Sequence, residues 1–288
     1  MNIRIIPRLD IKGPNLVKGI HLEGLRVLGK PESFARFYYE HGADELAYMD
    51  TVASLYGRNS LLEIVERTSR EIFIPLMVGG GLRTVDDIRA VLRAGADKVS
   101  INTAALNRPE LISEAARTFG SSTIVVSLEV IKKPDGCYEC YTDYGRQSTG
   151  IDAFEWATRA AALGAGELVV TSIDREGTGK GFDLELTRRI AESVSIPVIA
   201  HGGAGSVSDV IDVIRQGCAD AASTASLLHY HYVERIRQES QDFSSEGNVE
   251  FLKHGTGFSK IQPVSLPELK AMLIDHGIDC RPLQMEIT

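Results

Sequence analysis

The amino-acid sequence predicts a (β/α)8 TIM barrel built from two duplicated (β/α)4 halves. The segment Ile74–Gly81 recurs as Ile196–Gly203, with the same glycine-rich ending, and the similarity continues into the residues that follow each copy. Each half alternates short apolar runs with helical segments four times. Duplication of a four-unit half favours a closed barrel over an open doubly wound sheet, because each half covers the open edges of the other. We expect residues 1–288 to form a single domain.

Eight short apolar runs are bounded by Gly, Asp or Ser, as buried parallel strands are. They lie at residues 3–9, 45–50, 73–78, 97–101, 123–130, 167–172, 196–200 and 220–224. Ser or Thr followed three residues later by an acid marks helix starts at Ser60, Thr84, Ser206 and Ser265. Glycine marks helix ends at Gly42, Gly120, Gly164 and Gly277. A polar insertion at about residues 232–263 falls between the eighth strand and the last helix.

Composition excludes several classes of protein. The formal net charge is −8, so the chain offers no general surface for nucleic acids. No apolar stretch approaches the roughly 18 residues of a membrane helix, and the N-terminus has no export signal; we therefore expect a cytoplasmic protein. Cys137 and Cys140 form a Cys-x-x-Cys pair, which we interpret as part of a hairpin rather than as a metal or redox site. We expect no metal and no organic cofactor.

In barrels of this class the chemistry lies at the C-terminal ends of the strands. Glycine-rich turns follow the third and seventh strands, at residues 79–81 and 202–205, and the next strand of each half ends in small hydroxyl or amide residues. Glycine lets backbone N–H groups approach an anion closely, and the helix that follows adds its positive end. Two such turns on opposite sides of the mouth predict a long substrate with a phosphate at each end. The alternative is that these glycines only permit tight turns.

Two acidic residues lie between the predicted phosphate sites. Asp10 ends the first strand and Glu129 ends the fifth, at equivalent positions of the two halves. They are expected to face each other across the mouth, where burial and mutual repulsion separate the pKa values of a general acid and a general base. The alternative for each carboxylate is a surface cap or a salt bridge.

These residues resemble a known family, the cyclase subunit of imidazole glycerol phosphate synthase. The resemblance covers roughly residues 1–231 and resumes near 264–281. It is carried by Leu9-Asp10-x-Lys12, Val17-Lys18-Gly19, Asp44-Glu45-Leu46, Val78–Gly81, Ala96–Ala105, Thr171-Ser172-Ile173-Asp174-Arg175-x-Gly177-Thr178 and Gly202–Gly205.

The resemblance implies a mechanism and roles for individual residues. A partner glutaminase, a glutamine amidotransferase subunit that forms a heterodimer with the barrel, docks at the N-terminal barrel face and releases ammonia. The ammonia crosses the barrel interior and attacks a bis-phosphorylated ribulosyl aminoimidazole carboxamide nucleotide. Asp10 and Glu129 take the catalytic positions. The implied phosphate-binding residues are Lys18, Gly80, Gly81, Asn102, Thr103, Gly202, Gly203 and Ser226.

The resemblance also implies an ammonia gate at the barrel floor. Its charged ring is formed by Arg4, Glu45, Lys98 and Glu167. These residues lie at the N-terminal ends of their strands, where stability is the default role. A salt-bridge layer without any role in ammonia passage is therefore the alternative.

Several site positions depart from the family and are candidates for altered specificity. Glu129 and Glu176 replace the usual aspartates, and His201 replaces a small serine. Thr171, at the end of the sixth strand, is a further candidate.

Arg8 is the fourth departure, because it stands where the family has a small residue. Strand alternation points Arg8 into the barrel, on the same face as Asp10. A buried arginine must be paired, and Glu129 or Glu167 is the expected partner. Arg8 is also placed to obstruct or re-route the ammonia path.

The residues leave three functional hypotheses open. The first is the cyclase of histidine biosynthesis, which uses ammonia from the partner and needs no cofactor. The second is a paralogue that passes glutamine-derived ammonia to a sugar acceptor and forms an amidino group in surface polysaccharide synthesis. The third is a non-catalytic barrel that activates a glutaminase.

Overall fold

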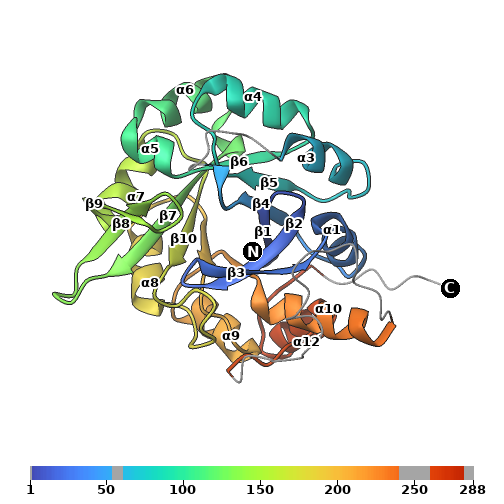
Figure 1. Ribbon diagram of the computed structural model, residues 1–288. Coiled ribbons are helices and arrows are strands. Elements are labelled where there is room, and N and C mark those ends of the chain that lie inside the picture. The colour runs from blue at the N-terminus through green and yellow to red at the C-terminus, as the bar shows by residue number, and fades with distance from the viewer. Residues whose placement is uncertain (1, 54–60, 240–259, 282–288) are drawn as a thin grey trace.

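The structure is a computed structural model, which describes residues 2–53, 61–239 and 260–281. Within them, eight parallel strands pair in a closed ring, because the last strand returns to pair with the first. The ring confirms the predicted barrel (Figure 1), and every predicted run overlaps one of its strands. The strands are β1 (Arg4–Lys12), β4 (Leu46–Asp50), β5 (Leu76–Gly79), β6 (Lys98–Ile101), β7 (Ile124–Lys132), β10 (Glu167–Ser172), β11 (Val198–His201) and β12 (Ala221–Thr224).

Helices surround the strand ring (Figure 1). Those in the described residues are α1 (Pro31–Glu40), α3 (Leu62–Thr68), α4 (Val85–Arg93), α5 (Thr103–Asn107), α6 (Glu110–Phe119), α7 (Ala153–Ala162), α8 (Leu184–Ser193), α9 (Val207–Arg215), α10 (Ser226–Glu239) and α12 (Leu266–Asp275), with a 3-10 turn at Ser121–Thr123. The capping boxes predicted at Thr84, Ser206 and Ser265 are confirmed, whereas Ser60 lies outside the described residues. The predicted end glycines all adopt positive φ just past a helix.

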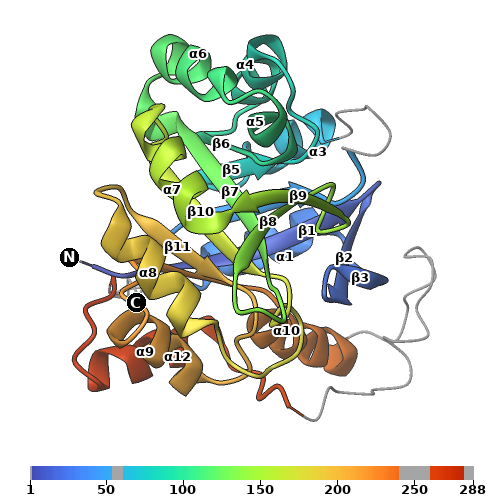
Figure 2. The ribbon, with the colours of Figure 1, turned by 90° about the vertical axis from the view of Figure 1, so that its left-hand side faces the viewer.

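Two hairpins extend the barrel at equivalent places in the two halves. After β1 come β2 (Asn15–Ile20) and β3 (Glu23–Gly29); after β7 come β8 (Tyr138–Thr142) and β9 (Gln147–Asp152). Cys140 lies buried on β8, which confirms the hairpin predicted around the cysteine pair. Figure 2 shows both hairpins at one end of the barrel and the N-terminus at the other. The hairpins therefore rise around the mouth.

Side chains fill the barrel interior in layers, because alternate residues of each strand point inward. Charged residues form the floor, and above them lies an apolar layer of Ile6, Ala47, Met77, Val125, Val169, Ile199 and Ala221. The next inward positions are polar and buried, and they include Arg8, Ser100, Ser127, Thr171, His201 and Ser223. The interior thus becomes polar toward the mouth.

The predicted insertion at 232–263 is described only at its two ends. Its first residues, up to Glu239, continue α10, and residues 240–259 lie outside the described part of the chain. Where the chain is described again, the Gln262 N–H donates to the carbonyl of Gly205, 2.7 Å away. The end of the insertion therefore packs on a mouth turn. None of the helices in the described residues has the length and apolar character that a bilayer crossing needs.

Candidate active site

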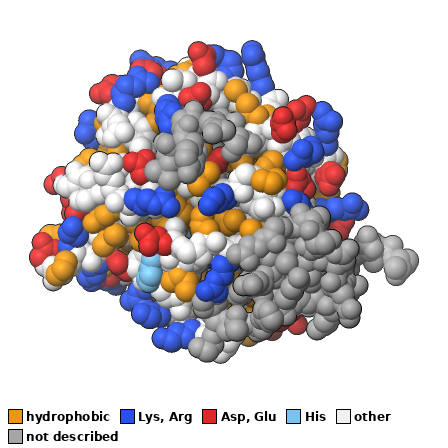
Figure 3. All heavy atoms as spheres, in the orientation of Figure 1, with side chains coloured by type: hydrophobic (Ala, Val, Ile, Leu, Met, Phe, Trp, Pro, Cys, Tyr) orange, Lys and Arg blue, Asp and Glu red, His pale blue; other side chains and the backbone are white. Residues whose placement is uncertain are grey.

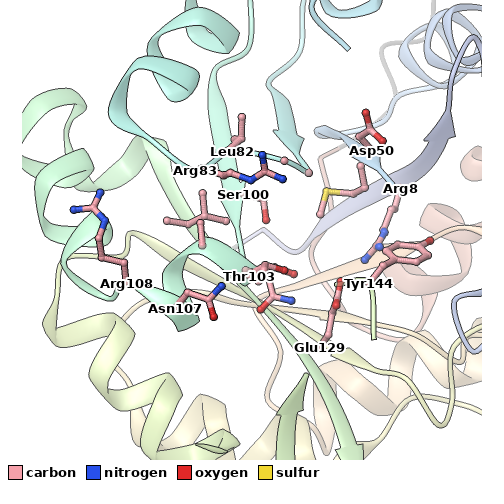
Figure 4. A pocket seen from close by; sticks show the side chains of 17 residues that line it. Arg8, Asp50, Leu82, Arg83, Ser100, Thr103, Asn107, Arg108, Glu129 and Tyr144 are labelled. Carbon is pink, nitrogen blue, oxygen red and sulfur yellow. The ribbon is translucent and has the colours of Figure 1, made fainter. Parts of the chain in front are cut away.

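The first glycine turn opens into a cavity of about 270 Å³ at the barrel mouth (Figure 4). Four of the predicted phosphate-binding residues line it, namely Gly80, Gly81, Asn102 and Thr103. Gly80 has φ +102°, and a Cβ there would lie 2.4 Å from the carbonyl oxygen of Asp50. The turn therefore requires glycine, and its backbone is open to a ligand.

The second glycine turn is far more confined. Its cavity measures about 10 Å³, roughly the space of one water molecule. The predicted residues that line it are Lys18, Glu176, His201, Gly202, Gly203 and Ser226. The structure thus brings each predicted set of phosphate residues together, but it leaves room for a ligand at only the first.

An internal carboxylate occupies the second site. Lys18 and Glu176 form a buried ion pair between Nζ and Oε1, and Glu176 Oε2 accepts from the backbone N–H of Leu22 at 3.0 Å. A carboxylate held by an ammonium and a backbone N–H satisfies the same groups that a phosphate oxygen would satisfy. A phosphate that binds here must therefore displace Glu176 from Lys18.

Asp10 is paired with Arg8 at the centre of the mouth. Arg8 Nε donates to Asp10 Oδ1 at 2.9 Å, and the two residues are only 2 % and 1 % exposed. Burial by itself would raise the pKa of Asp10, but the positive charges of Arg8 and Lys18 outweigh it and lower that pKa below its usual value. Asp10 is therefore held as a carboxylate.

The expected pairing of Arg8 with Glu129 or Glu167 is wrong. Residues two apart on a strand point to the same face, so the guanidinium reaches Asp10 on its own strand. Glu167 instead lies at the floor, where it binds Arg4 and Lys98. The inward direction predicted for Arg8 is confirmed, because its Nη1 also donates to Thr171 Oγ1 at 3.4 Å.

Glu129 has a different environment. Its side chain is buried, and its Oε2 accepts from the backbone N–H of Gly145 at 2.8 Å. Burial raises the pKa of Glu129 to about 7, although Arg8 opposes the shift. Two carboxyl groups whose pKa values move in opposite directions suit a fixed anion and a proton-transferring group.

Several buried polar atoms at the mouth have no hydrogen-bond partner within the described residues. They include Arg8 Nη2, Ser100 Oγ, Ser127 Oγ and Asn102 Oδ1 at the first cavity, and His201 Nε2, Ser223 Oγ, Thr224 Oγ1 and Ser226 Oγ at the second. Burying such atoms is costly unless a ligand or water satisfies them. Their concentration at the mouth indicates a binding site.

His201 is neutral in this environment. Burial, together with the nearby charge of Arg8, moves the pKa of His201 well below its ordinary value. One ring nitrogen, Nδ1, lies 3.0 Å from the carbonyl oxygen of Ser223. The ring therefore narrows the second cavity without adding a charge to it.

The residues of the first cavity that sequence reasoning missed include Ser100, Ser127 and Tyr144. The two serines were recognisable from strand alternation: Ser127 precedes Glu129 by two positions on β7, and Ser100 on β6 precedes Asn102, just past the strand end, by two. Tyr144 comes from the turn between β8 and β9, and no strand pattern places it.

The predicted floor ring is closed by ion pairs. Arg4 Nη1 lies 2.9 Å from Glu45 and 3.1 Å from Glu167, and Lys98 Nζ lies 2.8 Å and 3.1 Å from the same two carboxylates. Each cation therefore bridges both acids. The ring seals the base of the apolar layer with two positive and two negative groups.

Comparison with known proteins gives one consistent result. Residues 4–234 match the model of a family described as "Histidine biosynthesis protein". The chain is 59% identical over 208 residues to imidazole glycerol phosphate synthase subunit HisF of Legionella pneumophila, covering 72% of this chain and 98% of that protein. It is 50% identical over 237 residues to the subunit of the same name from Alkaliphilus metalliredigens (strain QYMF), covering 82% of this chain and 94% of that protein.

Proposed function

The chain belongs to the histidine biosynthesis protein family, and from that membership we infer how its barrel works. It is an enzyme, the cyclase of imidazole glycerol phosphate synthesis. With ammonia, it converts a bis-phosphorylated ribulosyl aminoimidazole carboxamide nucleotide to imidazole glycerol phosphate and aminoimidazole carboxamide ribotide. One observation supports this most: Asp10 and Glu129 are both buried, at equivalent strand ends, between two glycine-rich turns.

Asp10 and Glu129 have different roles at the barrel mouth. The phosphates bind at the glycine turns, which fixes the nucleotide across the barrel. Glu129 exchanges protons with the reacting atoms during ring closure and cleavage, because its pKa of about 7 lets it both give and take a proton. Asp10, held as a carboxylate beside Arg8, stabilises the positive charge that develops when ammonia attacks.

The barrel works in a heterodimer with a glutaminase subunit, and we place that subunit at the N-terminal face. The floor ring lies at this face, so ammonia released there meets the ring first and passes into the interior when its ion pairs open. Phe73, just before β5, is 79% exposed and borders a cavity of about 320 Å³ between the N-terminal ends of β5 and β6. An exposed aromatic beside a hollow is typical of a protein interface.

We expect Phe73→Asp to weaken glutamine-dependent turnover by tenfold or more at a fixed partner concentration. A buried aromatic anchor contributes at least about 1.4 kcal/mol to binding, which is a factor of ten. Turnover with an ammonium salt stays unchanged, because Phe73 lies at the opposite end of the barrel from Asp10. The measurement is the steady-state rate with each nitrogen source.

Met272→Asp is the matched control, because Met272 is an exposed apolar residue on α12. Loss of coupling in Met272→Asp, with normal coupling in Phe73→Asp, would move the docking face to the α12 side of the molecule.

The confined second site favours one other candidate function. Because Glu176 already satisfies Lys18 and the cavity there has about 10 Å³, an acceptor without a second phosphate fits the mouth as it stands. A sugar acceptor that receives ammonia to form an amidino group would meet this condition. A barrel with this function would retain the floor ring and the first glycine turn. It would differ only in the ligand group that binds at the second glycine turn.

A direct assay separates these functions. Purified protein, the bis-phosphorylated nucleotide and an ammonium salt are expected to form imidazole glycerol phosphate without the partner, because the whole reaction takes place at the barrel mouth. Product formation is followed by chromatography. Absence of turnover, in protein that still stimulates a glutaminase, would instead support either the sugar acceptor or a non-catalytic activating barrel.

A further inference from the structure

The inner end of the first cavity carries a set of polar groups that the proposed reaction does not yet use. Arg8, Ser100 and Ser127 are each 2% exposed and line this cavity. Figure 4 shows Arg8, Ser100 and Glu129 around the same space, with Arg108 at the far side. Among the described residues, Arg8 Nη2 and both serine hydroxyls are without a hydrogen-bond partner. A ligand group that reaches this end meets a hydrogen-bonding surface.

One donor and one acceptor of this surface have fixed identities. Arg8 uses Nε on Asp10 and Nη1 on Thr171, which leaves Nη2 as a donor only. Asn102 donates its Nδ2 to the carbonyl of Tyr141 at 3.1 Å, so its unpartnered, buried atom is the acceptor Oδ1. A ligand group that contacts both atoms therefore accepts from Arg8 and donates to Asn102.

The charge around this end disfavours an anion. Arg8 is neutralised by Asp10 at 2.9 Å, and the carboxyl groups of Asp50 and Glu129 also line the cavity. The exposed cations, Arg83 and Arg108, line the outer part of the cavity. Figure 3 shows further Lys and Arg side chains around the centre of the face that carries the barrel mouth. A phosphate is attracted to the outer part, and a neutral polar group fits the inner end.

We propose that Arg8 and Asn102 form a subsite for a primary carboxamide of the acceptor, with Arg8 Nη2 donating to the amide oxygen and Asn102 Oδ1 accepting from the amide nitrogen. A primary carboxamide is a neutral group that accepts and donates through adjacent atoms. The proposal rests on the proposed function, in which the substrate and one product carry this group. Arg8 thereby determines specificity while it also pairs with Asp10.

Two nucleotides that differ only in the carboxamide test the subsite. Binding of aminoimidazole carboxamide ribotide and of aminoimidazole ribotide is measured by calorimetry, and the affinity ratio cancels the contribution of the shared phosphate. The wild-type protein is expected to prefer the carboxamide by about tenfold or more, as hydrogen bonds to a charged group imply. Arg8→Met reduces the preference to within about twofold.

Arg117→Met, an exposed arginine on α6, is the control and keeps the preference. Asn102→Ala is expected to reduce the preference without disturbing the Arg8–Asp10 pair. It is the test of the subsite if Arg8→Met does not fold. Equal wild-type affinities, or an undiminished preference in a folded Arg8→Met or Asn102→Ala protein, would overturn the subsite and leave the cyclase function standing. Failure of both nucleotides to bind the wild-type protein would overturn both proposals.

Discussion

Asp10→Asn is expected to lower ammonia-dependent turnover by about a thousandfold. The substitution keeps the size of the side chain but removes the one charge that Arg8 holds at the centre of the mouth. Loss of an oriented charge or proton-transfer group costs roughly 10²–10⁴ in rate. The measurement is kcat with saturating nucleotide and an ammonium salt, so that the partner plays no part.

Two controls separate chemistry from folding in Asp10→Asn. The substitution leaves Arg8 buried without its partner, which destabilises the protein, so the double variant Arg8→Met/Asp10→Asn is tested with it. Asp275→Asn, at the exposed end of α12, is the control for replacing an aspartate by an asparagine away from the mouth. Near-normal turnover in folded Asp10→Asn would remove Asp10 from the mechanism.

Glu129→Gln is expected to reduce turnover by about 10²–10⁴ and to make the protein more stable at alkaline pH. The pKa of Glu129 is about 7 in the fold, against 4.5 for the ordinary group. Between these values the unfolded chain loses a proton that the folded chain keeps, so the folded state loses stability as the pH rises through 7. The total is roughly 3 kcal/mol at 1.36 kcal/mol per pKa unit.

Urea unfolding at pH 5 and pH 8 measures this effect. The free energy of unfolding of Glu129→Gln, relative to the wild type, should rise by roughly 3 kcal/mol between the two pH values. Glu192→Gln, on the exposed side of α8, should show no such rise. A relative stability that stays constant from pH 5 to pH 8 would mean that Glu129 titrates normally and does not serve as the group that exchanges protons near neutrality.

The sequence predicted the barrel because its evidence is periodic and repeated. The glycine-rich copies after β5 and β11 define the two halves of the repeat. Short apolar runs bounded by turn residues are typical of buried strands. The hairpin strands β2, β3 and β9 were missed because they are partly exposed and mixed in character. No single face of them gives a clean apolar pattern.

The sequence predicted part of the membership of the candidate site but not which of its charged residues pair. Strand ends and alternation place Asp10, Glu129 and Arg8 at the mouth, because the fold alone dictates those directions. Which of two nearby carboxylates an arginine binds depends on side-chain reach in three dimensions, so Arg8 was assigned to the wrong acid. The occupation of Lys18 by Glu176 likewise depends on a loop that no periodic pattern describes.

The two glycine turns lie at equivalent places in the repeated halves, yet only the first opens into a large cavity. A ligand with two similar ends would fit a perfectly symmetric mouth in either of two opposite orientations, one of which places the wrong atom beside Glu129. The cavities at the two turns have unequal volumes of about 270 and 10 Å³, and we expect this difference to favour one orientation. We expect one end of the ligand to enter the first cavity and the other end to displace Glu176 from Lys18, so that the ligand binds in one direction only.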